Sequence, residues 1–293
     1  MTSAVPAVSA SQLDLAYGPT RVAEGLDIAL ERGRITAIVG PNGCGKSTIL
    51  RGLARLLRPA GGVIYLHGEQ IQRLPAKTLA RQLAALPQAP EIPAGVTVWE
   101  LVGYGRFPHQ GLLRARSRAD IDAMEWAIDV TGLEPLRDRA VDTLSGGERQ
   151  RAWIAMALAQ QTQVLLLDEP TTFLDIHFQI DILSLVRRLN REHGITVGWV
   201  LHDLNQAAAY SDHMIMLRDG AVAIEGSPRA VMTPAAIKRV FGIDCCVINH
   251  PLGEVPMCLP NGLCPFAGDP QSAFSRSLAA KTDRATEELA HAT

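Results

Sequence analysis

One short segment has the residue types and spacing suited to binding a phosphate chain. It fits the pattern G-x-x-x-x-G-K-[ST] and consists of Gly40, Pro41, Asn42, Gly43, Cys44, Gly45, Lys46, Ser47 and Thr48. The apolar run 35–39 before it predicts a buried strand, and the residues after it predict the apolar face of a helix. A strand that turns through glycines into a helix leaves backbone N–H groups and the positive helix end in one concavity, which favours an anion. We therefore expect nucleotide phosphates there, with Lys46 supplying positive charge and Ser47 a hydroxyl for Mg²⁺.

Two carboxylates follow another apolar run. Residues 164–167 predict a strand buried on both faces, as in the middle of a parallel sheet, and Asp168 and Glu169 come directly after it. Asp168 is placed to hold Mg²⁺ opposite Ser47, whereas Glu169 points differently and can polarise an attacking water. The competing interpretation is a pair of surface acids that cap the next turn. The phosphate-binding segment upstream favours the catalytic interpretation.

Gln88 and His202 also come just after predicted strands, at 82–86 and 195–201. Ligands of open α/β sheets bind beyond the carboxyl ends of the strands. The amide oxygen of Gln88 can therefore reach a cation or water near the phosphates, although a plain polar loop residue is an equal interpretation. A lone histidine after a strand is usually structural, so the residues alone leave the role of His202 open.

The segment Ser145-Gly146-Gly147-Glu148 has the form of a capping box at the start of a helix. Its two glycines are expected to leave the helix start bare, so that an anion could approach the positive end of the helix dipole. A capping box by itself indicates only that a helix begins.

Composition narrows the class of protein. The chain has 293 residues, of which 47% are hydrophobic and 20% charged, and its net charge of -2 does not indicate a nucleic-acid surface. No apolar run approaches the roughly 18–20 residues that cross a bilayer, and the first ten residues lack the pattern of a secretory signal. Five cysteines without a Cys-x-x-Cys pair favour reduced thiols. Cys258 and Cys264 lack partners at the spacing of a zinc site.

Predicted strands and helices alternate along the chain, which indicates an α/β fold. We expect a disordered leader at residues 1–10 and one domain at 11–245, with a helical insert at about 89–160. Residues 246–293 are expected to form an extension that is loosely ordered from Asn261 onwards.

Shorter strands are predicted at two places outside the parallel sheet. Residues 12–16 and 26–30, separated by a turn, suggest an antiparallel edge. Residues 214–217 and 221–225, joined through Asp219-Gly220, predict a hairpin.

Taken together, these motifs resemble those of the ATP-binding cassette (ABC) ATPases over roughly residues 11–245. The resemblance identifies Tyr17 as the A-loop aromatic, Gly40–Thr48 as Walker A, Gln88 as the Q-loop, Leu144–Glu148 as the LSGGE-type signature, Val164–Glu169 as Walker B, Asp175 as the D-loop and His202 as the switch histidine. The Leu-Ser-Gly-Gly element separates this family from other P-loop NTPases. Without the resemblance, Tyr17 is interpreted as a half-buried residue at the end of a strand.

Within that family, several stretches look like the ATPases of ferric-siderophore importers, a group that also includes cobalamin and haem importers. These stretches are Gly105–His109, Asp142–Gly147, Gln150–Met156, Thr171–Asp175, Leu201–Gln206 and Val240–Cys245.

The resemblance implies a P-loop NTPase (RecA-like) core with an antiparallel β subdomain and an inserted helical subdomain. It also implies a head-to-tail homodimer with two sandwiched ATP molecules, each gripped by Walker A of one copy and by the helix start at Ser145–Glu148 of the other. Glu169 would act on water while His202 and Lys46 stabilise charge on the γ-phosphoryl oxygens. Mg²⁺ would be held by Ser47, Gln88 and Asp168.

The function implied is the ATPase subunit of an importer for an iron(III)–siderophore complex, peripheral on the cytoplasmic face of the inner membrane. Its partners would be a second copy, an integral-membrane permease and, indirectly, a periplasmic or surface substrate-binding protein, with no nucleic acid. Alternatives are the same role in cobalamin or haem import, or a soluble ABC ATPase of the iron–sulfur assembly or DNA-repair type. The absence of a long coiled coil between Walker A and the signature argues against the DNA-repair type.

Overall fold

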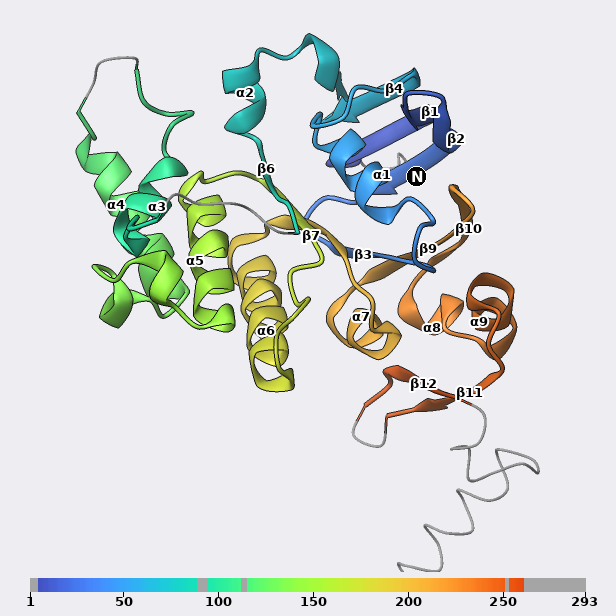
Figure 1. The fold of residues 1–293 in the computed structure, drawn as a ribbon. Helices are drawn as coiled ribbons and strands as arrows, with labels where there is room; N and C mark the ends of the chain where they lie inside the picture. The colour runs from blue at the N-terminus through green and yellow to red at the C-terminus, as the bar shows by residue number, and fades with distance from the viewer. Residues whose placement is uncertain (1–4, 89–93, 112–114, 251–252, 261–293) are drawn as a thin grey trace, which may run out of the picture.

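The computed structural model describes residues 5–88, 94–111, 115–250 and 253–260. Its centre is a six-stranded sheet with the strand order β10-β9-β3-β8-β7-β6 (Figure 1). The strands are β3 (Ile35–Val39), β6 (Leu83–Leu86), β7 (Val164–Asp168), β8 (Thr196–Val200), β9 (His213–Arg218) and β10 (Ala221–Gly226). All neighbours pair in parallel except β10, which forms the predicted hairpin with β9.

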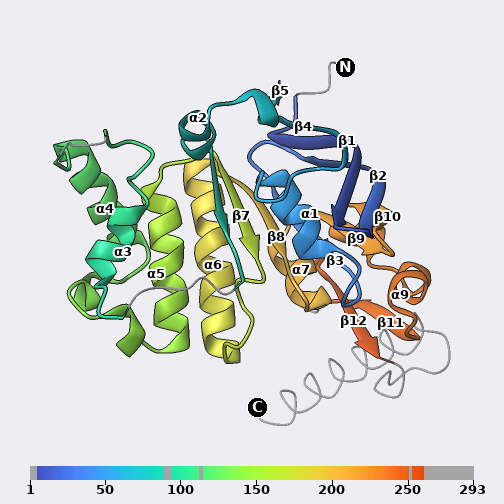
Figure 2. The same cartoon turned by 45° about the horizontal axis from the view of Figure 1, so that its top comes forward.

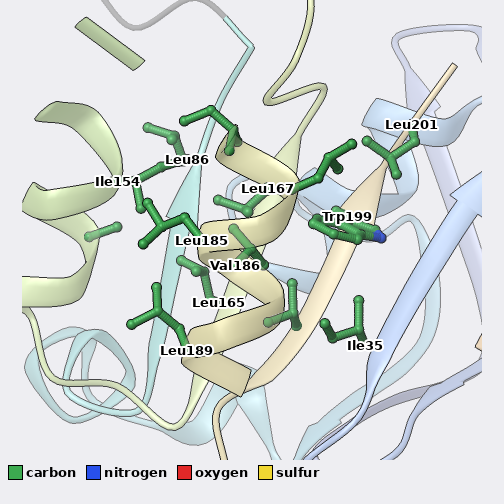
Figure 3. Packing of buried hydrophobic residues seen from close by; sticks show 14 of the residues in the cluster. Ile35, Leu86, Ile154, Leu165, Leu167, Leu185, Val186, Leu189, Trp199 and Leu201 are labelled. Carbon is green, nitrogen blue, oxygen red and sulfur yellow. The ribbon is translucent and has the colours of Figure 1, made fainter. Parts of the chain in front are cut away.

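The middle strands of this sheet are buried on both faces. Every residue of β3, β7 and β8 is buried, which agrees with the continuous apolar runs in the sequence. Helix α6 (Ile176–His193) packs its apolar stripe on one face of the sheet. Figure 3 shows Leu185 and Leu189 of α6 clustered with Leu165 of β7 and Trp199 of β8. The larger of the two apolar clusters therefore holds these strands, and with them the residues at their ends, in place.

A second, antiparallel sheet has the order β2-β1-β4-β5. It consists of β1 (Val8–Tyr17), β2 (Thr20–Leu30), β4 (Gly61–Leu66) and β5 (Glu69–Gln70). Helix α1 (Lys46–Leu53) lies between the two sheets and contacts β1 on one side and β7 and β8 on the other. The antiparallel subdomain is thus present, with strands longer than the sequence predicts.

The prediction of a disordered leader through residue 10 is wrong for its last part. β1 begins at Val8, and the side chains of Ala7, Val8 and Ala10 are buried. Alanine and serine alternate there with a single valine, so the hydrophobic period was too weak to indicate a strand. Pairing with β2 and β4 on both sides decides the conformation instead. The first four residues lie outside the described part of the chain.

Three helices lie between β6 and β7, at the side of the molecule away from the antiparallel sheet (Figures 1 and 2). They are α3 (Val98–Tyr104), α4 (Arg118–Val130) and α5 (Gly146–Ala159). Each begins with a capping box, in which Thr97, Ser117 or Ser145 exchanges hydrogen bonds with the residue three positions later. Within the described ranges, no helix is both long enough and apolar enough to cross a membrane.

The remaining elements are short and follow the sheet. They are the helices α2 (Ala76–Ala80), α7 (Leu204–Tyr210), α8 (Pro228–Val231) and α9 (Pro234–Phe241), the 3₁₀ turns Ile71–Arg73, Glu134–Leu136 and Val141–Thr143, and the strands β11 (Cys245–Asn249) and β12 (Pro256–Pro260).

The boundary expected at residue 245 falls inside the β11–β12 hairpin. Cys245 and Cys258 of this hairpin are buried in the main core, so β11 and β12 belong to the folded domain. Cys44, Cys245 and Cys258 are free thiols. The predicted loose tail from Asn261, with Cys264, lies outside the described residues.

A buried ion pair ties the three helices of the insert together. Arg106, just beyond α3, is 3% exposed, and Asp120, in the first turn of α4, is 5% exposed. The Nε atom of Arg106 donates to Oδ1 of Asp120 at 2.9 Å, and its Nη1 atom donates to the carbonyl oxygen of Ala159, the last residue of α5, at 2.6 Å. Burial by itself raises the pKa of Asp120, but hydrogen bonds from Ser117 and Arg106 outweigh it and hold the pKa at about 2.

The Asp120 carboxylate should therefore stabilise the fold in a pH-dependent way. Its pKa drops from 3.8 to about 2 on folding, which contributes roughly 2 kcal/mol to the free energy of unfolding above about pH 4. This contribution disappears as the pH falls through the folded pKa, and roughly half of it remains at about pH 3. We expect Asp120→Asn to be clearly less stable than the wild type at neutral pH in urea unfolding, with a smaller difference at pH 3.

A matched control lies on the same helix. Asp122 pairs with Arg118 at 2.8 Å, but its side chain is 53% exposed, so Asp122→Asn should change the free energy of unfolding by about 0.5 kcal/mol or less. Equal destabilisation by Asp120→Asn at neutral pH and at pH 3 would show that the ionised Asp120 carboxylate is not the source of this stability.

Candidate nucleotide site

The loop between β3 and α1 has the backbone that a phosphate cradle needs. Gly43 and Gly45 have φ angles of +78° and +98°, which residues other than glycine rarely adopt. Gly45 stands at the N-cap of α1 without a side-chain cap, so the first-turn N–H groups are left for another acceptor. Asn42 and Gly43 are exposed, whereas Cys44 is buried beneath the loop, and its burial raises the pKa of its thiol. Cys44 therefore packs as a neutral side chain.

Lys46 places a buried positive charge at this loop. Lys46 is only 5% exposed, and its Nζ atom donates to the carbonyl oxygens of Gly40 and Pro41, both at 2.9 Å. These carbonyls hold the ammonium group at the start of the loop. A phosphate entering the loop would meet both this charge and the backbone N–H groups.

Ser47 and Asp168 meet, as the sequence predicts. Ser47 Oγ donates to Asp168 Oδ1 at 2.7 Å. Asp168 is 3% exposed, and this burial raises the pKa of its carboxyl group, against which the Ser47 hydrogen bond acts. Its second oxygen, Oδ2, is buried without a hydrogen-bond partner, and the nearest cationic atom, Arg51 Nε, is 4.0 Å away.

This arrangement fits a magnesium site. An orphaned carboxylate oxygen beside a hydroxyl offers the hard oxygen ligands that Mg²⁺ prefers. Among the described residues, no cluster of three or more His, Cys, Asp or Glu side chains could hold a metal ion. Mg²⁺ at Ser47 and Asp168 would therefore depend on phosphate oxygens and water for its other ligands, which is its usual mode of binding.

Glu169 lies at the centre of a hydrogen-bonded cluster. His202 Nε2 is 2.7 Å from Oε1 of Glu169, while Gln88 Nε2 and Thr172 Oγ1 donate to Oε2 at 2.5 and 3.0 Å. The Glu169 side chain is 9% exposed, and its backbone has a left-handed φ of +52°. Both carboxylate oxygens are thus fixed in direction. Such a group is positioned to orient a water or accept its proton.

Two details of this cluster differ from the sequence analysis. Gln88, expected to face Mg²⁺, donates to Glu169 rather than to Ser47 or Asp168. Thr172 was not singled out, although its contact with Glu169 is as direct as that of Gln88. A threonine three positions after a glutamate does not by itself predict a contact between the two side chains. The contact follows only from the conformation of the turn between them. Here Thr172 N donates to the Glu169 carbonyl oxygen and closes that turn.

The signature segment stands at the start of α5, apart from the loop. Ser145 and Glu148 form the predicted capping box, with Ser145 N donating to Glu148 Oε2 at 2.9 Å and Glu148 N donating to Ser145 Oγ at 3.3 Å. The expectation of two bare glycines holds for Gly146, which is exposed. It is wrong for Gly147, because the ring of Phe178 covers the place where a Cβ would stand.

Tyr17 and Asp175 also lie outside the Glu169 cluster. Tyr17 ends β1 and is 46% exposed, and Asp175 caps α6 by accepting a hydrogen bond from Phe178 N at 3.1 Å. Among the hydrogen bonds between described residues, none joins Tyr17, Asp175 or the signature to the loop. In both Figure 1 and Figure 2, α6 and β7 stand between α5 and α1. One copy of the chain therefore brings together Lys46, Ser47, Gln88, Asp168, Glu169 and His202, and leaves the signature elsewhere.

The close approach of Gly45 to β2 can be tested directly. A Cβ at Gly45 would lie 2.8 Å from Cγ1 of Val22, so Gly45→Ala should distort the loop and weaken ATP binding by about tenfold or more, as 1.4 kcal/mol of strain does. The double variant Gly45→Ala with Val22→Ala should recover part of the affinity in a titration with a fluorescent ATP analogue. A double variant that binds no better than Gly45→Ala would rule out the contact with Val22 as the cause.

Comparison with known proteins agrees with this geometry. Residues 23–172 match the family described as ABC transporter. The chain is 49% identical over 262 residues to the ferric enterobactin transport ATP-binding protein FepC of Escherichia coli K12, which covers 89% of this chain and 97% of that protein. It is 48% identical over 252 residues to the iron(3+)-hydroxamate import ATP-binding protein FhuC of Bacillus subtilis 168, which covers 86% and 94%.

Solved structures show the same architecture. An inward-facing ABC transporter of the metal-chelate type aligns with a TM-score of 0.76 and 28% identity over 87% of this chain and 97% of that one. A bacterial ABC transporter cassette solved as a dimer aligns with a TM-score of 0.67 and 28% identity over 75% and 98%. The chain therefore belongs to the ABC transporter family and is one of its ATP-hydrolysing subunits.

Proposed function

We propose that this chain energises the import of an iron(III)–siderophore complex. The observation that carries the proposal is the similarity to FepC and FhuC over nearly the whole length of all three proteins, the helical insert included. The names of these relatives refer to different chelators, enterobactin and hydroxamate, but to the same metal. The cargo class proposed is therefore the ferric chelate, without a particular siderophore.

We further propose that two copies of the chain sandwich ATP. The signature tip at Ser145 and Gly146 is exposed, and beside it Phe173 and Ile176 are 94% and 67% exposed. Large apolar side chains this exposed mark a surface that another protein covers. A second copy, related head to tail, would place its own phosphate loop under this tip, so that N–H groups at the start of α5 face the γ-phosphate.

The residues around the nucleotide then have separate tasks. Tyr17 stacks on the base, and Lys46 and the loop backbone bind the phosphates. Ser47 and Asp168 would hold Mg²⁺, which would neutralise phosphate charge, and Gln88 holds the Glu169 carboxylate. Glu169 orients water for attack, and His202, already in contact with Glu169, stabilises charge on the γ-phosphoryl oxygens. ATP bound between two copies favours the closed dimer, and hydrolysis removes that preference.

The helical insert supplies a surface for an integral-membrane permease. Tyr104 and Phe107 stack with ring centroids 5.3 Å apart, and Phe107 is 63% exposed. Lys77 and Arg81 donate to the carbonyl oxygens of Gln110 and Pro108 and hold this segment against α2. We propose that this aromatic pair contacts the permease. The chain is then peripheral on the cytoplasmic face of the inner membrane, and a periplasmic or surface receptor delivers the chelate to the permease.

The trans arrangement predicts a variant that binds ATP but does not hydrolyse it. Ser145→Arg places a bulky cation at the exposed start of α5. Because Ser145 lies apart from the phosphate loop of its own copy, the arginine should block dimer closure without touching the loop that holds ATP. We expect ATP affinity within about twofold of the wild type and at least a hundredfold loss of turnover, equivalent to roughly 2.7 kcal/mol. An equal loss of affinity and turnover would place the signature in the same copy's site.

The cargo is tested by transport. A cell that lacks this chain should fail to accumulate radioactive iron supplied as a siderophore complex and should recover on re-expression. Uptake of cobalamin or haem instead of iron would reassign the cargo.

Phe107→Ser should lower co-purification with the permease by about tenfold, the loss expected when an aromatic anchor worth ~1.4 kcal/mol leaves an interface. Leu56, which follows α1 outside the insert and is 64% exposed, offers Leu56→Ser as a control that should keep the permease bound.

A further inference from the structure

The short helix that follows His202 is held in place by contacts at both of its ends. α7 has seven residues, and isolated helices of this length are marginal in water. At its start, Oδ1 of Asp203 accepts hydrogen bonds from the backbone N–H groups of Asn205 and Gln206 at 2.7 and 2.8 Å. At its end, Trp199 Nε1 donates to Ser211 Oγ at 3.0 Å. The position of α7 is therefore set by its surroundings.

One of these contacts joins α7 to the C-terminal hairpin. The backbone N–H of Cys258 donates to Asn205 Oδ1 at 2.7 Å, and Asn205 Nδ2 donates to the carbonyl oxygen of Cys258 at 3.2 Å. The side-chain amide thus pairs with one residue of β12 much as a neighbouring strand does. A carboxamide offers a donor and an acceptor in one planar group. Figure 1 and Figure 2 both show β12 next to α7.

The hairpin is a firm support for this contact. Cys245 and Cys258 are 9% and 7% exposed and belong to the same core cluster as Val240 of α9. Burial, and then the neighbouring Cys245, raise the pKa of Cys258 to about 12, so the Cys258 thiol packs as a neutral group. A separate ion pair between Arg229 and Glu254, at 2.6 Å, holds the hairpin to α8.

His202 needs such a support. It lies between β8 and α7 in a stretch that is neither strand nor helix, and its side chain is 45% exposed. β8 is fixed within the sheet, so the remaining freedom of the backbone at His202 is set by where α7 begins. Asn205 stands three residues further on, as the second residue of that helix.

We propose that Asn205 is a positioning residue, through which the β11–β12 hairpin sets the His202 ring against Glu169. This inference rests on the roles proposed above for His202 and Glu169. It gives the β11–β12 hairpin a part in ATP hydrolysis, which it exerts through α7. Loss of the amide pairing should let α7 shift and lengthen the 2.7 Å contact between His202 Nε2 and Glu169 Oε1.

The test uses kcat and KM for ATP in the full-length chain. Asn205→Leu removes both hydrogen bonds at nearly constant size. We expect kcat to fall about tenfold, which corresponds to ~1.4 kcal/mol, while KM and the affinity for a fluorescent ATP analogue stay unchanged. Asn205→Asp keeps an acceptor for Cys258 N–H and should show a smaller loss. Glu254→Gln removes only the exposed ion pair with Arg229 of α8 and keeps the Asn205–Cys258 hydrogen bonds, so kcat should stay unchanged.

A double-mutant cycle separates positioning from general support. If Asn205 acts through His202, Asn205→Leu should lower kcat no further in the His202→Ala background. Full additivity, or wild-type kcat in both Asn205 variants, would overturn the proposal, as would an equal loss in Glu254→Gln. Failure of the underlying function would look different. In that case His202→Ala itself, or Glu169→Gln, would hydrolyse ATP at the wild-type rate.

Discussion

Parallel pairing in the central sheet is the constraint on which the site depends. β3 pairs with β8 so that Ile38 lies opposite Val200, and β8 pairs with β7 so that Val200 lies opposite Asp168. The three strands therefore end at one level, and the residues just beyond them share one edge. β6 joins with Leu86 opposite Leu167, so that Gln88 and Glu169 each lie two residues beyond this matched pair. A slip of one residue in any pair would separate these groups and turn each strand's side chains to the other face.

Burial keeps that register in place. β3, β7 and β8 are buried along their whole length, so a shifted pairing would expose side chains that now pack under α1 and α6. The same burial raises the pKa of Asp168 and leaves one of its oxygens without a hydrogen-bond partner. A carboxylate in that condition gains from a nearby cation. The core that fixes the geometry thus also prepares the electrostatics of the site.

The sequence predicts the parts of this molecule whose signals are local. The loop 40–48, the capping boxes and the three apolar strands each follow from residue types within a few positions of one another. Thr172, Asn205 and the cover of Gly147 by Phe178 could not be predicted, because each depends on which distant segments the fold brings together. The β11–β12 hairpin was missed for a related reason, since its cysteines and prolines give no clear alternation. The trans role of the signature came from family resemblance, as a capping box alone indicates only a helix start.

The fold separates two sets of functional residues within one copy of the chain. One copy gathers the groups that bind phosphate and act on water, but its signature tip stands apart, with Phe173 and Ile176 exposed beside it. In the proposed dimer, closing two copies around ATP would supply the missing donors and cover those apolar side chains in one step. To drive a gate from 1:99 to 99:1 requires about 5.5 kcal/mol of differential binding, which two ATP molecules, each shared by one loop and one helix start, would provide.

The most direct measurement is a structure of the full-length Glu169→Gln variant with ATP and Mg²⁺. The account predicts a two-fold dimer in which Gly146 of one copy lies against the γ-phosphate held by Lys46 of the other. Single copies with bound ATP, or a dimer in which Gly146 is remote from both nucleotides, would contradict it.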